Sequence, residues 1–188
     1  LPMLPEALSN DVCSLRPHEE RRAMSVEMLI DEKGFVRDAR ITPSVIKSKA
    51  RLTYGAVQVS IDALQAGDFQ AAVAALRPMA GAFAEDIAQS IGVLHEIAQV
   101  LHANRVRRGG MDFESEEAKV HLNDEGVPVS VAIRRKTDAT VLVEEAMIAA
   151  NEAVARYLRD AGIPSIFRVH EPPSSGDLAE LVPILQEF

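Results

Sequence analysis

Residues 24–41 read MSVEMLIDEKGFVRDARI. Every second residue over 24–30 is apolar, which is the two-residue period of a half-buried strand. The Asp-Glu-Lys-Gly segment at 31–34 supplies turn residues, and 35–41 can return as a second strand. We therefore expect a β-hairpin here.

A second hairpin is predicted further along the chain. Residues 118–122 and 127–133 both alternate apolar and polar side chains, on either side of an Asn-Asp-Glu-Gly turn. Helices are expected at 56–66, 69–77 (ending near Pro78), 82–106, 138–160 (with Asp138 as N-cap) and 177–185, and a short strand at 166–170. Hairpins mixed with helices, without regular strand-helix-strand alternation, favour an α+β fold with a twisted, largely antiparallel sheet and packed helices.

Length and composition are those of one soluble domain. The chain has 188 residues, a net charge of -8 and a single cysteine, Cys13. One thiol cannot form an intramolecular disulfide, so a reducing, cytoplasmic compartment is expected, and Cys13 itself is interpreted as a small buried side chain. No apolar run approaches the ~20 residues of a membrane span. The acidity alone disfavours nucleic acid as a partner.

Common catalytic motifs are missing. The sequence has no phosphate-binding glycine loop, dinucleotide fingerprint, nucleophile elbow or His-Glu-x-x-His pair. His95 and His102 are two helical turns apart, too far for one metal, and are interpreted as partly buried or surface histidines. An acidic run is interpreted as solvated rather than metal-binding: Asp112, Glu114, Glu116 and Glu117.

Local charge opposes the global charge in the connector at 44–54, which carries three cations within eight residues. Tyr54 closes this connector, and Phe113 follows a double glycine. Each aromatic, taken alone, is more typical of a side chain packed in the protein than of a surface on which a ligand stacks. Arg168 and His170 share one face of the expected strand and are interpreted as a polar sheet edge.

Two adjacent glutamates on the predicted helix 138–160 differ in placement. The expected buried stripe comprises Val143, Met147, Ala150, Val154 and Leu158. Glu144 and Asn151 then lie beside the stripe, whereas Glu145 falls on the far side, as an exposed partner of Arg156 or a solvated charge. A carboxylate at the core margin costs desolvation unless something binds it, so Glu144 is a candidate site residue. Spacing alone names no reaction.

Six ordered blocks together resemble a known family. They read PMLP with LSN (2–10) and CSL (13–15), SKARLTY (48–54), RGG through FESEEAK (108–119), EEAMIAAN (144–151) and FRVHEPP (167–173). This order resembles the RNB catalytic domain of the ribonuclease II and ribonuclease R exoribonucleases, closest to the bacterial ribonuclease R branch. The resemblance runs from end to end of the chain.

The resemblance implies a processive 3′–5′ exoribonuclease that hydrolyses single-stranded RNA to nucleoside 5′-monophosphates with magnesium. In that family the metal is held by an aspartate cluster ahead of PMLP, and a later arginine stabilises charge at the cleaved phosphate. This sequence contains neither and has no Asp-Asp pair. We therefore expect residues 1–188 to be part of an RNB domain, with no catalytic or metal-binding residue in this chain, flanking RNA-binding domains in the full-length protein, and no activity in isolation.

The resemblance also implies how RNA is held. Tyr54 matches a tyrosine that contacts RNA near the 3′ end and helps set end-product size. Phe113 matches an aromatic that clamps the base stack, and Glu144 matches a glutamate at the 3′-terminal nucleotide. Arg51, Asn151, Arg168 and His170 are weaker candidates for RNA contact.

One departure from the family pattern follows the CSL block, where the usual Asp-Arg is replaced by Glu20-Arg21. A different class of function stays open beside the enzyme. The alternative to the enzyme is a non-catalytic RNB-like module that binds RNA or a protein.

Overall fold

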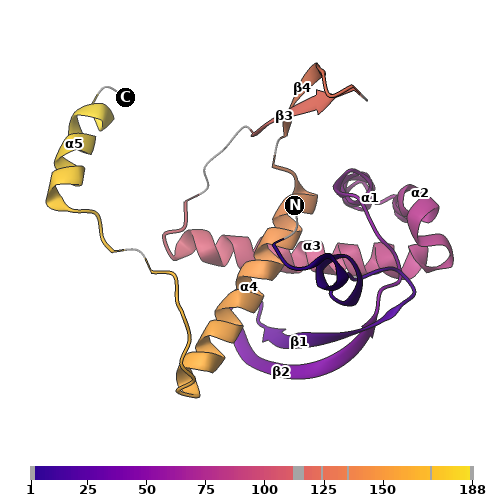
Figure 1. Cartoon of the computed structure of the whole chain (residues 1–188), viewed down its shortest axis with the longest axis horizontal. Coiled ribbons are helices and arrows are strands. Elements are labelled where there is room, and N and C mark those ends of the chain that lie inside the picture. The colour runs from indigo at the N-terminus through magenta and orange to yellow at the C-terminus, as the bar shows by residue number, and fades with distance from the viewer. Residues whose placement is uncertain (1–2, 112–116, 124, 135, 170, 187–188) are drawn as a thin grey trace. The chain divides into compact units, whose positions relative to one another are not determined.

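The structure is a computed structural model that describes residues 3–111, 117–123, 125–134, 136–169 and 171–186 (Figure 1). In chain order the elements are the π-helical turn η1 (Leu8–Val12), β1 (Glu20–Ile30), β2 (Val36–Lys47), α1 (Tyr54–Gln65), α2 (Phe69–Ala80), the 3-10 turn η2 (Gly81–Phe83), α3 (Ala84–Arg107), β3 (Glu117–Leu122), β4 (Pro128–Arg134), α4 (Asp138–Asp160) and α5 (Ser175–Leu185). The chain divides into two compact units, Leu1–Ala155 and Arg156–Phe188. Both expected hairpins are confirmed, and the fold is α+β.

The first hairpin is longer than the sequence pattern indicates. β1 and β2 pair antiparallel from Glu20 opposite Lys47 to Ile30 opposite Val36, with one register shift beside Leu29. Met24 is 64% exposed, whereas the following alternate residues are half-buried, so the apolar alternation describes only the second half of β1. The first part of the basic connector belongs to β2.

The turn of this hairpin packs against α3, and glycine is required there. Gly34 has φ of +78°, and a Cβ at this position would lie 2.5 Å from the carbonyl oxygen of Val100. Asn104 donates from Nδ2 to the Gly34 carbonyl at 2.7 Å, and Arg107 donates from Nη2 to the Lys33 carbonyl at 2.6 Å. The turn therefore fixes the hairpin to the C-terminal half of α3.

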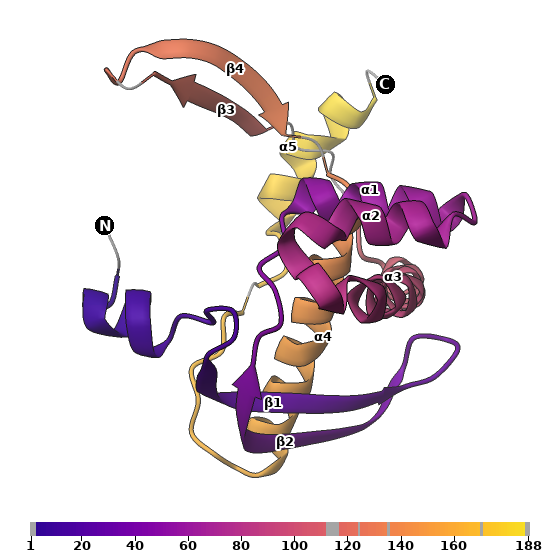
Figure 2. The ribbon, with the colours of Figure 1, turned by 90° about the vertical axis from the view of Figure 1, so that its right-hand side faces the viewer.

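The core is formed mainly by α1, α2 and α3, and Ala139 and Leu142 of α4 also belong to it. α1 and α2 lie side by side over α3 (Figures 1 and 2). The most deeply buried side chains of this core include Ile61, Ala72, Val73, Leu76, Ala84 and Ala88. Asp68 caps α2 by accepting from the Ala71 amide at 2.9 Å, and α2 continues to Ala80 instead of ending at Pro78. A proline breaks only the hydrogen bond to the preceding turn, so the last residues stay helical.

α4 crosses α3 steeply and packs through small side chains (Figures 1 and 2). Its buried residues are Ala139, Leu142, Glu145, Ala149 and Ala153. The prediction of the buried stripe is therefore wrong, because the observed buried face is offset from it by about one residue. Met147, which the stripe included, is 57% exposed. Three of these five buried residues are alanines, so small side chains dominate the buried face.

The start of α4 also differs from the expectation. The amide of Thr137 donates to Thr140 Oγ1 at 2.9 Å, and Thr140 Oγ1 donates to the Thr137 carbonyl at 2.7 Å. Thr137, one residue before Asp138, thus makes the capping contacts. Its hydroxyl also lies 3.4 Å from the Thr140 amide, which it can accept as an N-cap does.

Two further expectations are wrong. Residues 163–169 form no strand, because apolar alternation produces a strand only where a partner strand supplies hydrogen bonds. Cys13, which was expected to be buried, is exposed. In the second unit, α5 is confirmed and begins with a capping box between Ser174 and Asp177.

Candidate nucleic-acid interface

Tyr54 is the first residue of α1, at the end of the basic connector. Thr53 caps the helix by accepting from the Ala56 amide at 3.3 Å, which fixes the backbone direction at Tyr54. Tyr54 is 47% exposed. The residue is thus partly accessible to a ligand, while its backbone is held by the helix.

The connector before Tyr54 presents cations to solvent. Ala50 and Leu52 pack against the helical core, whereas Lys49 and Arg51 are exposed. This two-residue alternation is that of an extended segment covering a core. Lys49 Nζ also lies 4.7 Å from the centroid of the Phe83 ring, a cation–π distance. The result is a row of positive charge on an acidic chain, leading to an exposed aromatic.

Glu144 lies at the core margin, as expected. Its side chain is 41% exposed, its Oε2 is 3.0 Å from Lys136 Nζ, and its Oε1 is 3.8 Å from Arg105 Nη2. Cations thus lie on two sides of this carboxylate and restrict its orientation. Glu144 is therefore a fixed, partly accessible hydrogen-bond acceptor.

Glu145 is buried, which corrects the expectation of an exposed charge paired with Arg156. Its side chain is 2% exposed, and its Oε1 accepts from Arg105 Nη2 at 2.8 Å and Nε at 3.0 Å. His102 Nδ1 lies 3.0 Å from the same oxygen. The rotation of α4 is the physical reason, because the face that packs on α3 is centred near Glu145 rather than Val143.

A hydrogen bond links the helices that carry Tyr54 and Glu144. Gln58, in α1, accepts from the amide of Ala139, in the first turn of α4, at 2.9 Å. Tyr54 is four residues before Gln58 and Glu144 is five after Ala139, so each lies about 6–8 Å along its helix from this junction. The fold thus brings these two candidates, ninety positions apart in sequence, to one α1–α4 junction.

The remaining candidates are distributed differently. Arg51 is exposed in the connector, and Asn151 is exposed on α4. Arg168 is exposed in the irregular segment of the second unit. Phe113 and His170 lie outside the described residues. Arg51 and Tyr54 therefore lie just before and at the start of α1, and Glu144 lies in the second turn of α4.

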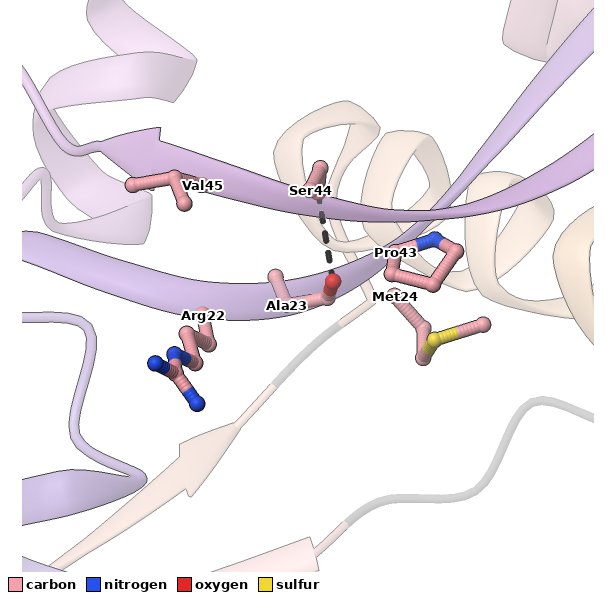
Figure 3. Close-up of a pocket in the computed structure, with 6 residues that line it drawn as sticks. All are labelled: Arg22, Ala23, Met24, Pro43, Ser44 and Val45. Carbon is pink, nitrogen blue, oxygen red and sulfur yellow. Dashed lines mark hydrogen bonds between the residues drawn. The ribbon is translucent and has the colours of Figure 1, made fainter.

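Two hollows lie elsewhere. One of about 680 Å³ opens on the β1–β2 ribbon, where Arg22, Met24 and Pro43 project and Ser44 donates to the Ala23 carbonyl (Figure 3). The other, of about 230 Å³, lies between α1 and α3, where His95 Nε2 is 2.9 Å from the amide nitrogen of Gln99. In the second hollow His95 Nε2 is also 3.2 Å from the side-chain nitrogen of Gln65, but no site residue predicted from the sequence lines either hollow.

Within the described ranges, no three His, Cys, Asp or Glu side chains gather in a way that could hold a metal ion. These residues therefore do not fit a magnesium site. Three of the four acids of the expected solvated run, at 112–116, lie outside the described residues. None of the described helices is both long and apolar enough to cross a bilayer.

Sequence reasoning did not assign three polar residues to this region: His102, Arg105 and Lys136. Arg105 reads as an ordinary cation at a helix C-terminus, and Lys136 reads as a loop charge. The sequence signal that could have identified this region is the set of alanines at 139, 149 and 153. These alanines lie on the buried face of α4, which also contains Glu145.

Comparisons with known proteins show the family and the fold of this chain. The family model described as the RNB domain matches residues 1–188. Ribonuclease R 1 of Lactococcus lactis is 38% identical over 188 residues, which cover all of this chain and 21% of that protein. Ribonuclease R of Aquifex aeolicus is 37% identical over 186 residues, 99% of this chain and 24% of that protein. The chain thus spans about a fifth to a quarter of the length of these curated relatives.

A solved structure is similar over the same extent. Mycoplasma genitalium RNase R in complex with ribose methylated single-stranded RNA superposes with a TM-score of 0.81 at 26% identity, covering 99% of this chain and 27% of that one. The same enzyme in complex with double-stranded RNA gives a TM-score of 0.81 at 25% identity, with 99% and 30% covered. With a family match over its whole length, this chain belongs to the RNB-domain family.

Proposed function

We propose that this chain supplies the RNA-holding part of the active-site channel of a processive 3′–5′ exoribonuclease, cytoplasmic and magnesium-dependent, that hydrolyses single-stranded RNA to nucleoside 5′-monophosphates. The observation that carries the proposal is the junction of α1 and α4, where an exposed tyrosine and a fixed carboxylate lie close to one hydrogen bond. RNA bound in the related Mycoplasma genitalium structures supports it.

Each group at the junction suits a different part of a single strand. An accessible tyrosine ring stacks on a base, an interaction of about 1–3 kcal/mol. The Glu144 side chain offers carboxylate oxygens that accept hydrogen bonds, so its partner is a donor such as a ribose hydroxyl rather than a phosphate. The cations of the connector, Lys49 and Arg51, attract the phosphate backbone.

In this proposal, the residues that bind magnesium are not among those that the structure describes. When bound, a divalent metal would supply polarisation of the phosphate and activation of the attacking water. We propose that its ligands come from parts of the native polypeptide beyond this chain, together with further RNA-binding domains. The residues here then orient the strand.

The function is tested on the full-length native polypeptide with single-stranded RNA labelled at either end. A 3′–5′ enzyme releases the 3′ label at once as a mononucleotide and leaves the 5′ label on a short end product. A large excess of unlabelled RNA added after binding leaves a processive reaction unaffected. Binding without magnesium-dependent hydrolysis would favour the non-catalytic module instead.

The contribution of the junction is tested by Tyr54→Ala. We expect the dissociation constant for single-stranded RNA to rise about 5- to 150-fold, which corresponds to loss of one stacked base. Tyr157→Ala is a matched control, because Tyr157 is the other tyrosine of the chain and is similarly exposed, at 53%. Equal effects of the two variants would contradict a specific role of Tyr54.

A further inference from the structure

A buried charge cluster joins α3 to α4 beside the proposed RNA site. Glu145 Oε1 accepts from Nε and Nη2 of Arg105, so the guanidinium holds one oxygen with two of its nitrogens. The Arg105 side chain is 17% exposed and that of Glu145 is 2% exposed. Both groups are thus largely withdrawn from water.

Stability alone does not explain this pair. Desolvation of two charges offsets most of their attraction, and apolar residues of similar volume often replace such pairs at no loss of stability. A planar guanidinium held at two nitrogens has a defined orientation, however, which a single ammonium does not. The pair therefore specifies geometry.

The geometry it specifies includes Glu144. Arg105 Nη2, which binds Glu145, is also 3.8 Å from Glu144 Oε1. Lys136 holds the other oxygen, Oε2, at 3.0 Å. Since Glu144 and Glu145 are neighbours on one helix, fixing Glu145 against α3 also fixes the rotation of α4 and the direction in which Glu144 points.

We propose that Arg105, anchored by Glu145, is a positioning residue that aligns the Glu144 carboxylate for the sugar of the bound RNA terminus. The proposal rests on the proposed function of Glu144. Arg105 acts through Glu144 and does not itself touch the RNA.

The same two helices offer a matched control. Arg108 of α3 lies with Nη2 3.1 Å from Glu152 Oε1 of α4, and this pair is half-exposed, at 51% and 41% of the two side chains. It bridges the same helices but does not contact Glu144. Arg105→Lys and Arg108→Lys each preserve the charge and remove the fork.

The test measures RNA affinity of the full-length protein by fluorescence anisotropy in EDTA, which prevents magnesium-dependent hydrolysis. We expect Arg105→Lys to raise the dissociation constant roughly tenfold, within the range of couplings between contacting residues. Arg108→Lys should change it less than about twofold, as expected for an exposed pair.

A second background separates positioning from a merely structural role. In Glu144→Gln protein, which already binds RNA weakly, Arg105→Lys should have no further effect. The same loss in both backgrounds would overturn the proposal, because Arg105 would then act independently of Glu144. Glu145→Gln, which keeps the shape of the anchor, should reproduce both results with an unchanged circular dichroism spectrum at the assay temperature.

Failure of the proposed function has a different signature. Unchanged affinity of Glu144→Gln would remove Glu144 from the RNA site and overturn both proposals together. Weaker binding of Glu144→Gln with unchanged binding of Arg105→Lys and Glu145→Gln would leave the RNA site intact and overturn only the positioning role.

Discussion

Gly34 provides a measurement of how strongly the β1–β2 hairpin is fixed to α3. Replacing Gly34 with alanine places a Cβ 2.5 Å from the Val100 carbonyl oxygen and 2.9 Å from the Asn104 Cβ. Both distances are far inside van der Waals contact, and the first involves backbone that cannot rotate away. The turn or the helix must therefore move.

Two separate costs add to the expected loss. A residue other than glycine at φ of +78° costs about 1–2 kcal/mol, because its Cβ approaches its own backbone. Overpacking against α3 costs a further 1–3 kcal/mol or so. We expect Gly34→Ala to lower the free energy of unfolding by about 2–5 kcal/mol in total.

Gly67→Ala separates the two costs. Gly67 has the same φ of +78°, but nothing lies within 4 Å of its would-be Cβ. The difference between the two variants, in urea denaturation followed by far-UV circular dichroism, is then the contact cost alone. A difference below about 0.5 kcal/mol would refute the close packing of this turn on α3.

Four further predictions follow from single features. Ser60→Ala should raise the free energy of unfolding by about 1 kcal/mol in the same urea assay, because Ser60 Oγ is buried without a hydrogen-bond partner in the described structure; destabilisation would contradict this. The Phe35 amide, with help from the Arg37 side chain, holds the pKa of Asp31 below its usual 3.8. The Asp31 carboxylate therefore stabilises the fold above the unfolded-state pKa of about 3.9, and this stabilisation is lost as the pH falls below that value. Asp31→Asn should thus make the free energy of unfolding less dependent on pH between about pH 5 and 3, and an unchanged pH dependence would contradict this. Phe113→Ala should weaken single-stranded RNA binding by about 1–3 kcal/mol with an unchanged thermal transition, and a collapsed transition would indicate a packing role. The isolated chain should release no nucleoside monophosphates from RNA in magnesium, and any robust release would refute the assignment of the metal ligands to other parts of the protein.

The hairpins and helices were predictable because their signals are local. The turn at 31–34 is an example, since Asp31 Oδ1 accepts from the amides of Lys33 and Phe35 at 2.9 Å each. Such contacts depend on residues within one turn and are therefore visible in the sequence. The helix 138–160 was likewise predictable in extent, from its composition and its glycine stop.

The buried face of α4 was not predictable in the same way. Large apolar residues such as Met147 mark an apparent stripe, but the helix packs through Ala149 and Ala153 because small side chains allow a closer approach. The position of Glu145 follows from that contact and from Arg105, forty residues away. The candidate strand at 166–170 failed for a related reason, since pairing depends on a partner strand that the segment itself does not reveal.

The hydrogen bond from Ala139 to Gln58 has a consequence for protein engineering. The segment between α3 and α4 is held at both ends by side chains, with Arg108 on Glu152 at its start and Gln58 on Ala139 at its close. A connection fixed in this way tolerates lengthening, because each doubling of a flexible loop costs only about 0.6 kcal/mol of closure entropy. The turn at 123–126 is thus a place to graft a reporter peptide or an affinity tag while α1 and α4 keep their alignment.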